Sequence, residues 1–407
     1  MTDSRVPSGA RQSTLRATNL ALALRAVCAD PGELSRAGVA AALGTTRGTA
    51  TRLVDELVAG GLLDEVERGP GSRRGRPATP LAPGSRPVGL GMQVDAGLVA
   101  VRVLDLRGRV LAERLHEEDL RDSDPVAALT LLGGLTAGVL ASLPAGVRVV
   151  GAGLALPGLV DAGRGLLLRA PNLGWSEVRP ADVLAGLLPD GPVPVLGNEA
   201  DLAARSVAER APGLPGPHRD FVYLSGQIGI GGAAVLAGRV MTGSSGWAGE
   251  IGHVCVDPDG PACPCGSTGC LERYAGRLAL LSAAGVPADA GPAELRARSR
   301  AGDPVADRAV DGAARALGIA LAGVVNVLDI PTVVLGGHLA ELGDLLCPRL
   351  EDHLIRRVLS ARWRRPVVTA GAVAPAAGAT GAALGALHGV LEDPVRWLPA
   401  GEPRQPW

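Results

Sequence analysis

Apolar residues recur at helical spacing over the first sixty residues of the chain. Leucines and valines return every three or four positions, which is the period of one helix face. Ser35 and Thr45 or Thr46 are typical helix N-caps, and Gly44 and Gly60 are typical helix ends. The pattern predicts three helices, at residues 13–28, 35–43 and about 45–59.

The segment Leu-Leu-Asp-Glu-Val-Glu at 62–67 follows these helices, and then a loop rich in Arg, Gly and Pro at 68–77. Two helices joined by a short glycine turn, followed by a hairpin with a basic tip, are typical of a winged helix-turn-helix. Arginines and short hydroxyls suit contacts to phosphates and base edges. We therefore expect DNA contacts from the third helix and from the tip, at Arg47, Thr49, Thr51, Arg52, Arg74 and Arg76. The alternative is a solvated helix face followed by a basic linker.

From residue 88 the pattern changes to strands alternating with helices. Strands are predicted at 88–94, 98–104, 147–156 and 193–196, and a helix at 124–143. This alternation indicates an α/β fold. The predicted division is a winged helix-turn-helix domain at 1–82, a linker at 83–87 and an α/β domain at 88–395.

The charge is divided in the same way. Residues 1–86 hold 12 Arg against 8 Asp and Glu, a net of +4, and the remainder holds 28 against 33, a net of −5. A basic first part on an acidic body points to double-stranded DNA as the partner of the first part alone.

The composition, with 47% hydrophobic and 20% charged residues in 407, is typical of a soluble globular protein with two or three domains. No secretory signal and no convincing membrane span is found, so a cytoplasmic protein that does not enter a membrane is expected.

Three of the six cysteines form a cluster, Cys263, Cys265 and Cys270, with His253 ten residues before the first of them. Such a cluster is typical of a metal site in a reducing compartment. Three thiolates and one imidazole complete the tetrahedral shell of a structural Zn²⁺ and leave no position for a catalytic water. Glu250 and Glu272 bracket these ligands, so a closed zinc site at 253–270 would hold two carboxylates in fixed places, as a polyol site needs.

The run from Gly249 to Glu272 resembles the zinc motif of the ROK family (repressors, open reading frames and kinases), with Gly-His followed by Cys-x-Cys-Gly-x-x-Gly-Cys-Leu-Glu. Ser35-Arg36-Ala37 and residues 46–51 resemble the N-terminal domain of the family's repressors. The resemblance extends over residues 88–390. It implies an actin-like (sugar kinase/Hsp70-type) two-lobed ATPase fold preceded by an all-α/winged helix-turn-helix domain.

The resemblance also implies a sugar site. Kinases of the family carry Asn-Asp-x-Asn at a strand end, where this chain has Asn198-Glu199-Ala200-Asp201. Asn198 matches a sugar ligand, while Glu199 replaces the catalytic Asp and is one methylene longer, a shift that is costly for a general base. By the same resemblance the expected sugar-binding set is Asn172, Asn198, Glu199, Glu250, His253 and Glu272.

The phosphate loops of the kinases are altered here. The first, Asp-x-Gly-Gly-Thr, corresponds to residues 92–99, where Leu98 and Val99 are apolar, and in the second Ile228 stands at the Thr position. Phosphoryl transfer depends on positioning and charge stabilisation, so these changes argue against kinase activity.

We expect a dimeric or tetrameric repressor of carbohydrate genes, controlled by a sugar or sugar phosphate, and not an enzyme. The alternatives are a sugar kinase with a vestigial head and a regulator controlled by a protein partner.

Overall fold

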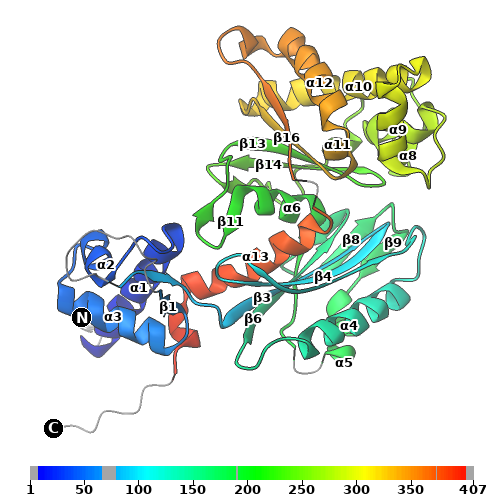
Figure 1. Cartoon of the computed structure of the whole chain (residues 1–407). Helices are drawn as coiled ribbons and strands as arrows, with labels where there is room; N and C mark the ends of the chain where they lie inside the picture. The colour runs from blue at the N-terminus through cyan, green and yellow to red at the C-terminus, as the bar shows by residue number, and fades with distance from the viewer. Residues whose placement is uncertain (1–7, 67–78, 189–190, 373, 400–407) are drawn as a thin grey trace, which may run out of the picture.

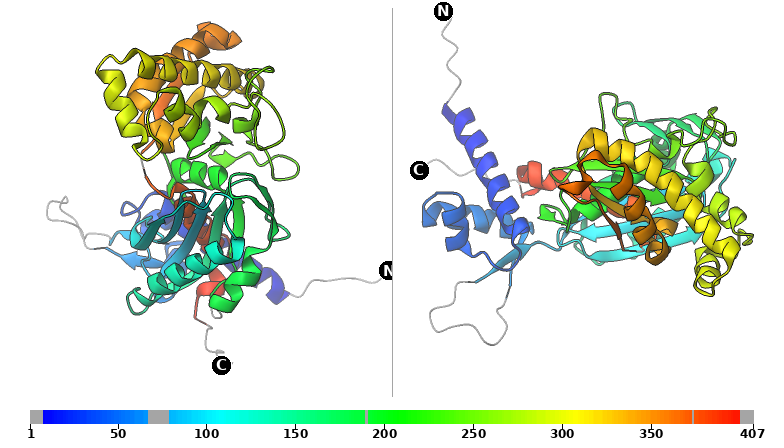
Figure 2. Two further views of the ribbon diagram at one scale, coloured as in Figure 1. Left: turned by 90° about the vertical axis from the view of Figure 1, so that its right-hand side faces the viewer. Right: turned by 90° about the horizontal axis from the view of Figure 1, so that it is seen from above.

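The computed structural model describes residues 8–66, 79–188, 191–372 and 374–399. Within them the chain forms a helical head and two α/β lobes, and a C-terminal helix runs from between the lobes to the head (Figure 1). Two further views place the head at one end of the molecule (Figure 2).

The head contains three helices and a two-stranded sheet, α1 (Ser8–Ala29), α2 (Arg36–Ala42), α3 (Arg47–Ala59), β1 (Leu63–Glu65) and β2 (Leu81–Pro83). The side chain of Ser35 accepts a hydrogen bond from the amide of Gly38, and that of Thr46 from the amide of Thr49. Of the two threonines that the sequence allows as a cap, Thr46 is the one used. β1 and β2 pair antiparallel, as the stem of a wing does.

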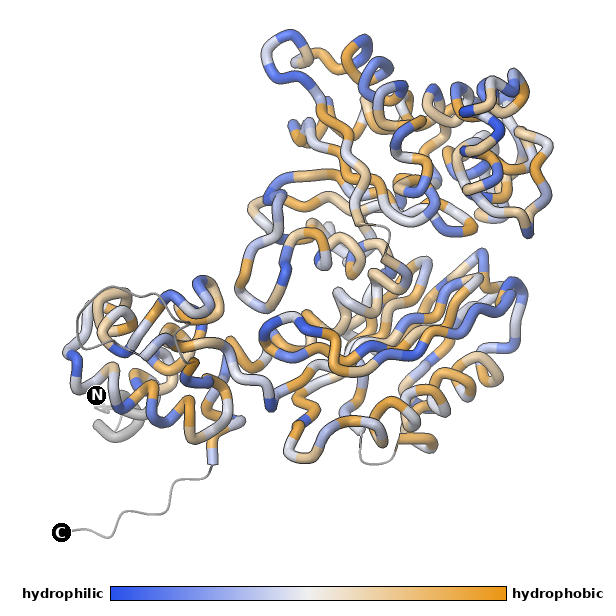
Figure 3. The backbone as a smooth tube through the Cα atoms, in the orientation of Figure 1, coloured by the Kyte–Doolittle hydropathy of each residue, from blue (hydrophilic) through white to orange (hydrophobic). Residues whose placement is uncertain are grey.

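The first lobe is a mixed sheet in the order β10-β6-β3-β4-β5, in which β3, β6 and β10 run parallel. α4 covers one face and the C-terminal helix the other. β3 is buried along its whole length, whereas the edge strand β5 is mostly exposed and hydrophilic (Figure 3). The elements are β3 (Pro87–Asp95), β4 (Leu98–Asp105), β5 (Val110–Glu117), α4 (Pro125–Ala141), β6 (Arg148–Leu156), β7 (Leu159–Asp161), β8 (Leu166–Ala170), β9 (Trp175–Val178), α5 (Pro180–Leu187) and β10 (Val195–Asn198).

The second lobe has a sheet in the order β15-β14-β13-β16-β17. Alternate residues of β13 enter two cores: Val222 and Leu224 pack with the long helices, and Phe221 and Tyr223 with α6. The elements are α6 (Glu199–Ala208), β11 (Glu209–Ala211), β12 (Leu214–Pro215), β13 (Phe221–Gly226), β14 (Ile230–Leu236), β15 (Arg239–Val240), η1 (Ile251–His253), α7 (Glu272–Ala275), α8 (Arg277–Ala283), α9 (Gly291–Arg300), α10 (Pro304–Leu328), β16 (Thr332–Gly336), α11 (Gly337–Glu341), α12 (Gly343–Arg357), η2 (Leu359–Arg362) and β17 (Val367–Ala370).

The head shares a hydrophobic core with the first lobe. The helix α13 (Ala377–Glu392) crosses β3 and β6, and Leu384 and Leu387 on it lie in one buried cluster with Leu20 and Leu24 of α1. η3 (Pro394–Trp397) packs beside α1. A change in the position of α13 would therefore be transmitted to the helical head.

Among the described residues, α10 is the one helix that is long and apolar enough to cross a membrane, and 56% of its apolar window is buried in the second lobe. Its apolar face packs against α12, as expected for the core helix of a folded domain.

Candidate functional site

A cavity between the two lobes brings together all six residues that the sequence singles out for sugar binding. Asn172 comes from the first lobe, after β8. Asn198 and Glu199 stand at the start of α6, and the other three surround the cysteine loop of the second lobe. We call this cavity the cleft; it is lined by Asn172, Asn198, Glu199, Glu250, His253 and Glu272 together with Asp95, Ser225 and the glycines of β14.

Glu199 is one of the deeply buried carboxylates of the cleft, with 7% of its surface exposed. Its pKa is raised from 4.5 to about 7, mainly by burial and in part by the nearby Asp95, while the Ser225 hydroxyl opposes the shift. That hydroxyl donates a hydrogen bond of 3.0 Å to Glu199 Oε1. A carboxyl group poised near neutral pH can accept or donate a hydrogen bond to a ligand hydroxyl.

Asn198 has a structural task besides the one predicted for it. Its Oδ1 accepts hydrogen bonds from the amides of Ala200 (2.8 Å) and Asp201 (3.2 Å), so it is the N-cap of α6. Its Nδ2 donates to the carbonyl oxygen of Gly158 at 3.0 Å. One amide proton is left for a ligand, because an Asn side chain has two donors.

The ligand atoms of His253, Cys263, Cys265 and Cys270 all lie within 4.8 Å of one another. The sulfurs of Cys265 and Cys270 are 3.7 Å apart, and Cys263 Sγ is 3.9 Å from His253 Nδ1. Zn–S bonds of about 2.3 Å in a tetrahedron place two sulfurs about 3.8 Å apart. The four side chains therefore fit a metal ion of this kind, and all three cysteines are free thiols.

The two carboxylates that bracket this cluster lie against its histidine. Glu272 Oε1 is 3.8 Å from His253 Nδ1 and accepts a hydrogen bond of 3.1 Å from Cys263 Sγ. Glu250 Oε2 is 3.9 Å from His253 Nε2, on the other side of the ring. Burial raises the pKa of Glu250, with His253 opposing and Glu272 adding to the shift.

Sequence reasoning missed two polar residues of the cleft and one outside it. Asp95 is 5% exposed and accepts a hydrogen bond of 2.8 Å from Gln93, and Ser225 donates a hydrogen bond to Glu199. Asp201 lies near Glu250 but does not line the cleft. A polar residue at the end of an otherwise apolar strand is the signal that could have found Asp95 and Ser225.

On the head, Arg47 and Arg52 of α3 are exposed. The hydroxyls of Thr49 and Thr51 have partners inside the head: Thr49 Oγ1 lies 3.0 Å from Thr46 Oγ1, and Thr51 Oγ1 donates to the Arg47 carbonyl at 2.8 Å. Arg74 and Arg76 lie outside the described residues.

A separate cavity of about 250 Å³ is lined by residues from the two stretches that the sequence predicts to be altered phosphate loops. Leu98 and Ile228 line it, with Asp95, Glu117, Glu341 and a single arginine, Arg277. Three carboxylates and two aliphatic side chains are unfavourable neighbours for a polyphosphate.

The sequence model of the ROK family matches residues 99–388, and that of the MarR family matches residues 21–75. The chain belongs to the ROK family. A putative xylose repressor from Caldicellulosiruptor sp. (strain Rt8B.4) is 30% identical to this ROK protein over 356 residues, which cover 82% of this chain and 86% of the relative.

Solved structures agree on the architecture. A ROK family transcriptional regulator, a homolog of the E. coli MLC protein, superposes with a TM-score of 0.73 over 93% of this chain and 98% of its own, at 24% identity. A ROK family glucokinase from Streptomyces griseus, in complex with glucose and AMPPNP, superposes with a TM-score of 0.63 at 26% identity and covers 73% of this chain and 98% of its own.

These matches confirm the predicted two-lobed fold behind a helix-turn-helix head. Because the chain carries a MarR-type head and matches a repressor along most of its length, it stands among the DNA-binding repressors of the ROK family rather than its kinases.

Proposed function

We propose that this protein represses carbohydrate genes and that a free aldose bound in the cleft controls its hold on operator DNA. The observation that carries the proposal is the joining of two parts in one chain: a MarR-type head with exposed arginines on α3, and a cleft lined by four carboxylates, a histidine and three side-chain amides. Groups of this kind hydrogen-bond to hydroxyls, and the relative named for xylose makes xylose the first effector to test.

Zn²⁺ would be held by His253, Cys263, Cys265 and Cys270 and would serve a structural role. Four protein ligands satisfy a tetrahedral ion. The ion would keep the cysteine loop folded, and the loop in turn positions Glu250, His253 and Glu272 toward the cleft.

The route from the cleft to the head runs through Gln93 and α13. Asp95 lines the cleft and accepts a hydrogen bond from Gln93 Nε2 at 2.8 Å, and Gln93 Oε1 accepts one from the Ala379 amide of α13 at 3.0 Å. At the other end of α13, Arg25 Nε of α1 donates to the Leu391 carbonyl at 3.1 Å. A sugar that binds one arrangement of the lobes more tightly than another would shift the position of the head.

In a homodimer or tetramer, two such heads would read a palindromic operator, and a change in their spacing would weaken the complex. Because the relatives named are repressors, we expect sugar binding to release the protein from its operator DNA. A regulator of this kind acts in the cytoplasm.

We expect no kinase activity. The cavity beside the altered phosphate loops is lined by Leu98, Ile228 and three carboxylates, and the base position holds Glu199, which is buried against Ser225. The second candidate is a sugar kinase, favoured by the glucokinase match to the two lobes. Sugar-dependent release of ADP separates the two.

The test uses the full chain with intact zinc and DNA from the promoter of its own gene and of neighbouring sugar genes. Fluorescence anisotropy should show specific binding that xylose or another aldose weakens. Arg47→Ala should weaken binding to every sequence and reduce the salt slope by about one unit. Arg219→Ala, an exposed arginine of the second lobe, is the matched control.

Specific DNA binding that no aldose alters, while a protein partner alters it, would replace the sugar with the protein-partner mechanism. ATP turnover on the order of 1–100 per second with a sugar would establish the kinase instead.

A further inference from the structure

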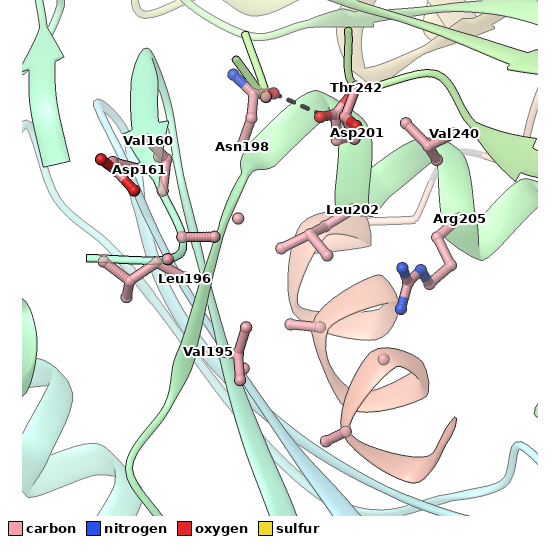
Figure 4. Close-up of a pocket in the computed structure, with 18 of the residues that line it drawn as sticks. Val160, Asp161, Val195, Leu196, Asn198, Asp201, Leu202, Arg205, Val240 and Thr242 are labelled. Atoms are coloured by element: carbon pink, nitrogen blue, oxygen red, sulfur yellow. Dashed lines mark hydrogen bonds between the residues drawn. The ribbon is translucent and has the colours of Figure 1, made fainter. Parts of the chain in front are cut away.

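A second cavity, of about 420 Å³, lies on the far side of α6 from the cleft. Figure 4 shows its walls: β10 and the β7 strand from the first lobe, α6 above, and α13 behind. Residues after β15 close it from the second lobe. We call it the back cavity; its polar groups are Asp161, Asn198, Asp201, Arg205, Thr242 and Ser245.

Asp201 is the residue of this cavity that most needs an explanation. Its Oδ1 atom is buried and has no hydrogen-bond partner among the residues that the structure describes. Leaving a buried carboxylate oxygen unpaired costs free energy, and such atoms are rare in folded proteins. Burial raises the pKa of Asp201 to about 7, Glu250 adds to the shift, and Arg205 opposes it.

Arg205 lies one turn along α6 from Asp201 and is pressed against α13. A Cβ atom at Gly385 of α13 would come within 2.5 Å of Arg205 Nη1, so a glycine leaves room for the guanidinium there. Arg205 makes no ion pair within 4.0 Å among the described residues. Its donors therefore face the cavity without a carboxylate partner, as Figure 4 shows for the side chain.

The charges select the kind of ligand. Asp161 has a positive partner, because Arg164 Nε lies 4.0 Å from its Oδ2, and Arg205 offsets the charge of Asp201. The charges around the cavity therefore balance. A phosphate or carboxylate ligand would meet Asp161 and Asp201, and an amine would meet Arg205, so neither gains from the net charge. A neutral molecule with several hydroxyls can donate to the carboxylates and accept from Arg205, Thr242 and Ser245, and its carbon chain can pack on Val160, Leu196 and Leu202.

We propose that the back cavity binds a small neutral polyol, and that this second ligand tunes the response of the cleft. The two sites share the wall formed by Asn198 and the first turn of α6. Both are lined from the two lobes, so a ligand that spans the back cavity favours the lobe arrangement that fits it. The cleft sugar then binds more or less tightly by the same factor, because the coupling is reciprocal.

Three probes with one six-carbon chain test the charge argument: D-glucitol is neutral, D-gluconate is an anion and D-glucamine is a cation. Titration calorimetry on the zinc-loaded full chain should show D-glucitol binding more tightly than either charged probe. Arg205→Leu should weaken D-glucitol about tenfold or more, because it deletes a hydrogen bond to a charged group. The matched control Arg210→Leu changes an exposed arginine near the end of α6 and should leave the affinity unaltered.

Glu272→Gln separates the two sites, because Glu272 lines the cleft and not the back cavity. D-glucitol binding should survive it. Binding that Glu272→Gln abolishes and Arg205→Leu leaves intact would place the polyol in the cleft and overturn the proposal, as would failure of the wild-type chain to bind D-glucitol. If Arg205→Leu does not fold, Thr242→Val at the exposed rim removes one hydroxyl and should weaken D-glucitol in the same direction. These outcomes are independent of whether an aldose releases DNA.

Discussion

The two walls of the cleft are held in place by different means. One wall is the start of α6, where Asn198 caps the helix and the buried alanines Ala200, Ala203 and Ala204 anchor it between the lobes. The other is the cysteine loop between His253 and Glu272, all of it described, which has turns and two isolated bridges in place of helices and strands. A wall with little core of its own depends on cross-links, and here a metal held by His253 and the three cysteines would supply one.

From this difference we expect that the proposed sugar response can be lost while the fold is retained. Removal of the metal should disorder the cysteine loop and leave α6, the lobes and the head in place, because each of those has an apolar core. Substitutions on the α6 wall should act on stability and on the ligand together.

The largest effect is expected from the metal. Cys265→Ser removes one of four ligands and should lower zinc affinity at least about 100-fold and abolish the response to sugar. Elemental analysis and DNA release measure the two losses. Cys255→Ser is the matched control, because this exposed thiol lies in the same segment but outside the cluster. If protein purified without chelator holds no zinc and still responds to sugar, then a metal does not hold this wall of the cleft in place.

The buried Glu199 of the α6 wall should make the free energy of unfolding depend on pH. The folded chain holds the pKa of Glu199 at about 7 against an ordinary 4.5, so its contribution to stability is fully present below about pH 4.5 and is lost as the pH rises through about 7. Over that pH window the free energy of unfolding of Glu199→Gln should rise relative to that of the wild type by on the order of 3 kcal/mol. Denaturant unfolding at several pH values measures the difference.

Ser225→Ala sharpens this prediction. It deletes the hydrogen bond that lowers the pKa of Glu199, so the loss of stability should extend to higher pH. Parallel pH profiles of the wild type and Glu199→Gln would show that the carboxyl group is not perturbed as described.

Glu272→Gln tests the other wall of the cleft without replacing any of the four metal-type ligands. It should weaken the cleft sugar about 10-fold to 100-fold, the cost of a hydrogen bond to a charged group, and leave DNA binding without sugar unchanged. The zinc content must be measured in the same preparation, since Glu272 also accepts a hydrogen bond from Cys263. Unaltered sugar affinity at full zinc content would show that Glu272 does not bind the sugar.

The smallest effect is expected from substitutions of Asn198, the N-cap of α6. Asn198→Ala should cost about 1 kcal/mol of stability because two amides of α6 lose their acceptor. Asn198→Asp keeps the acceptor and deletes the donor to Gly158, so it should retain most of the stability while weakening the sugar. Equal unfolding free energies for Asn198→Ala and the wild type would contradict the capping role.

Much of the fold follows from local patterns. The three head helices lie close to their predicted ranges because caps such as Ser35 and breaks such as Gly44 act within one turn of the chain. The strands predicted at 88–94 and 98–104 appear as β3 and β4, since long apolar runs bounded by turns favour buried strands. The four metal ligands come together as predicted because short loops join three of them.

Other features depend on contacts between segments far apart in sequence. Gln93 meets Ala379 across 286 residues, and the back cavity takes its walls from the first lobe, the second lobe and α13. No periodicity or spacing reports such contacts, because packing of whole elements decides them. The task of Asn198 as a cap of α6 likewise appears only once the strand β10 and the helix are seen to join at that residue.

By itself, then, the sequence determined the kinds of elements, the four clustered metal-type side chains and six of the residues that line the cleft, because each rests on a local pattern or a short motif. The tertiary structure alone decided that the head shares a core with the first lobe, that Glu199 is buried between Ser225 and Asp95, and that Asp201 is left unpaired in a second cavity. The physical reason is that burial, and with it the pKa of a carboxyl group or the cost of an unpaired oxygen, is a property of how distant elements pack.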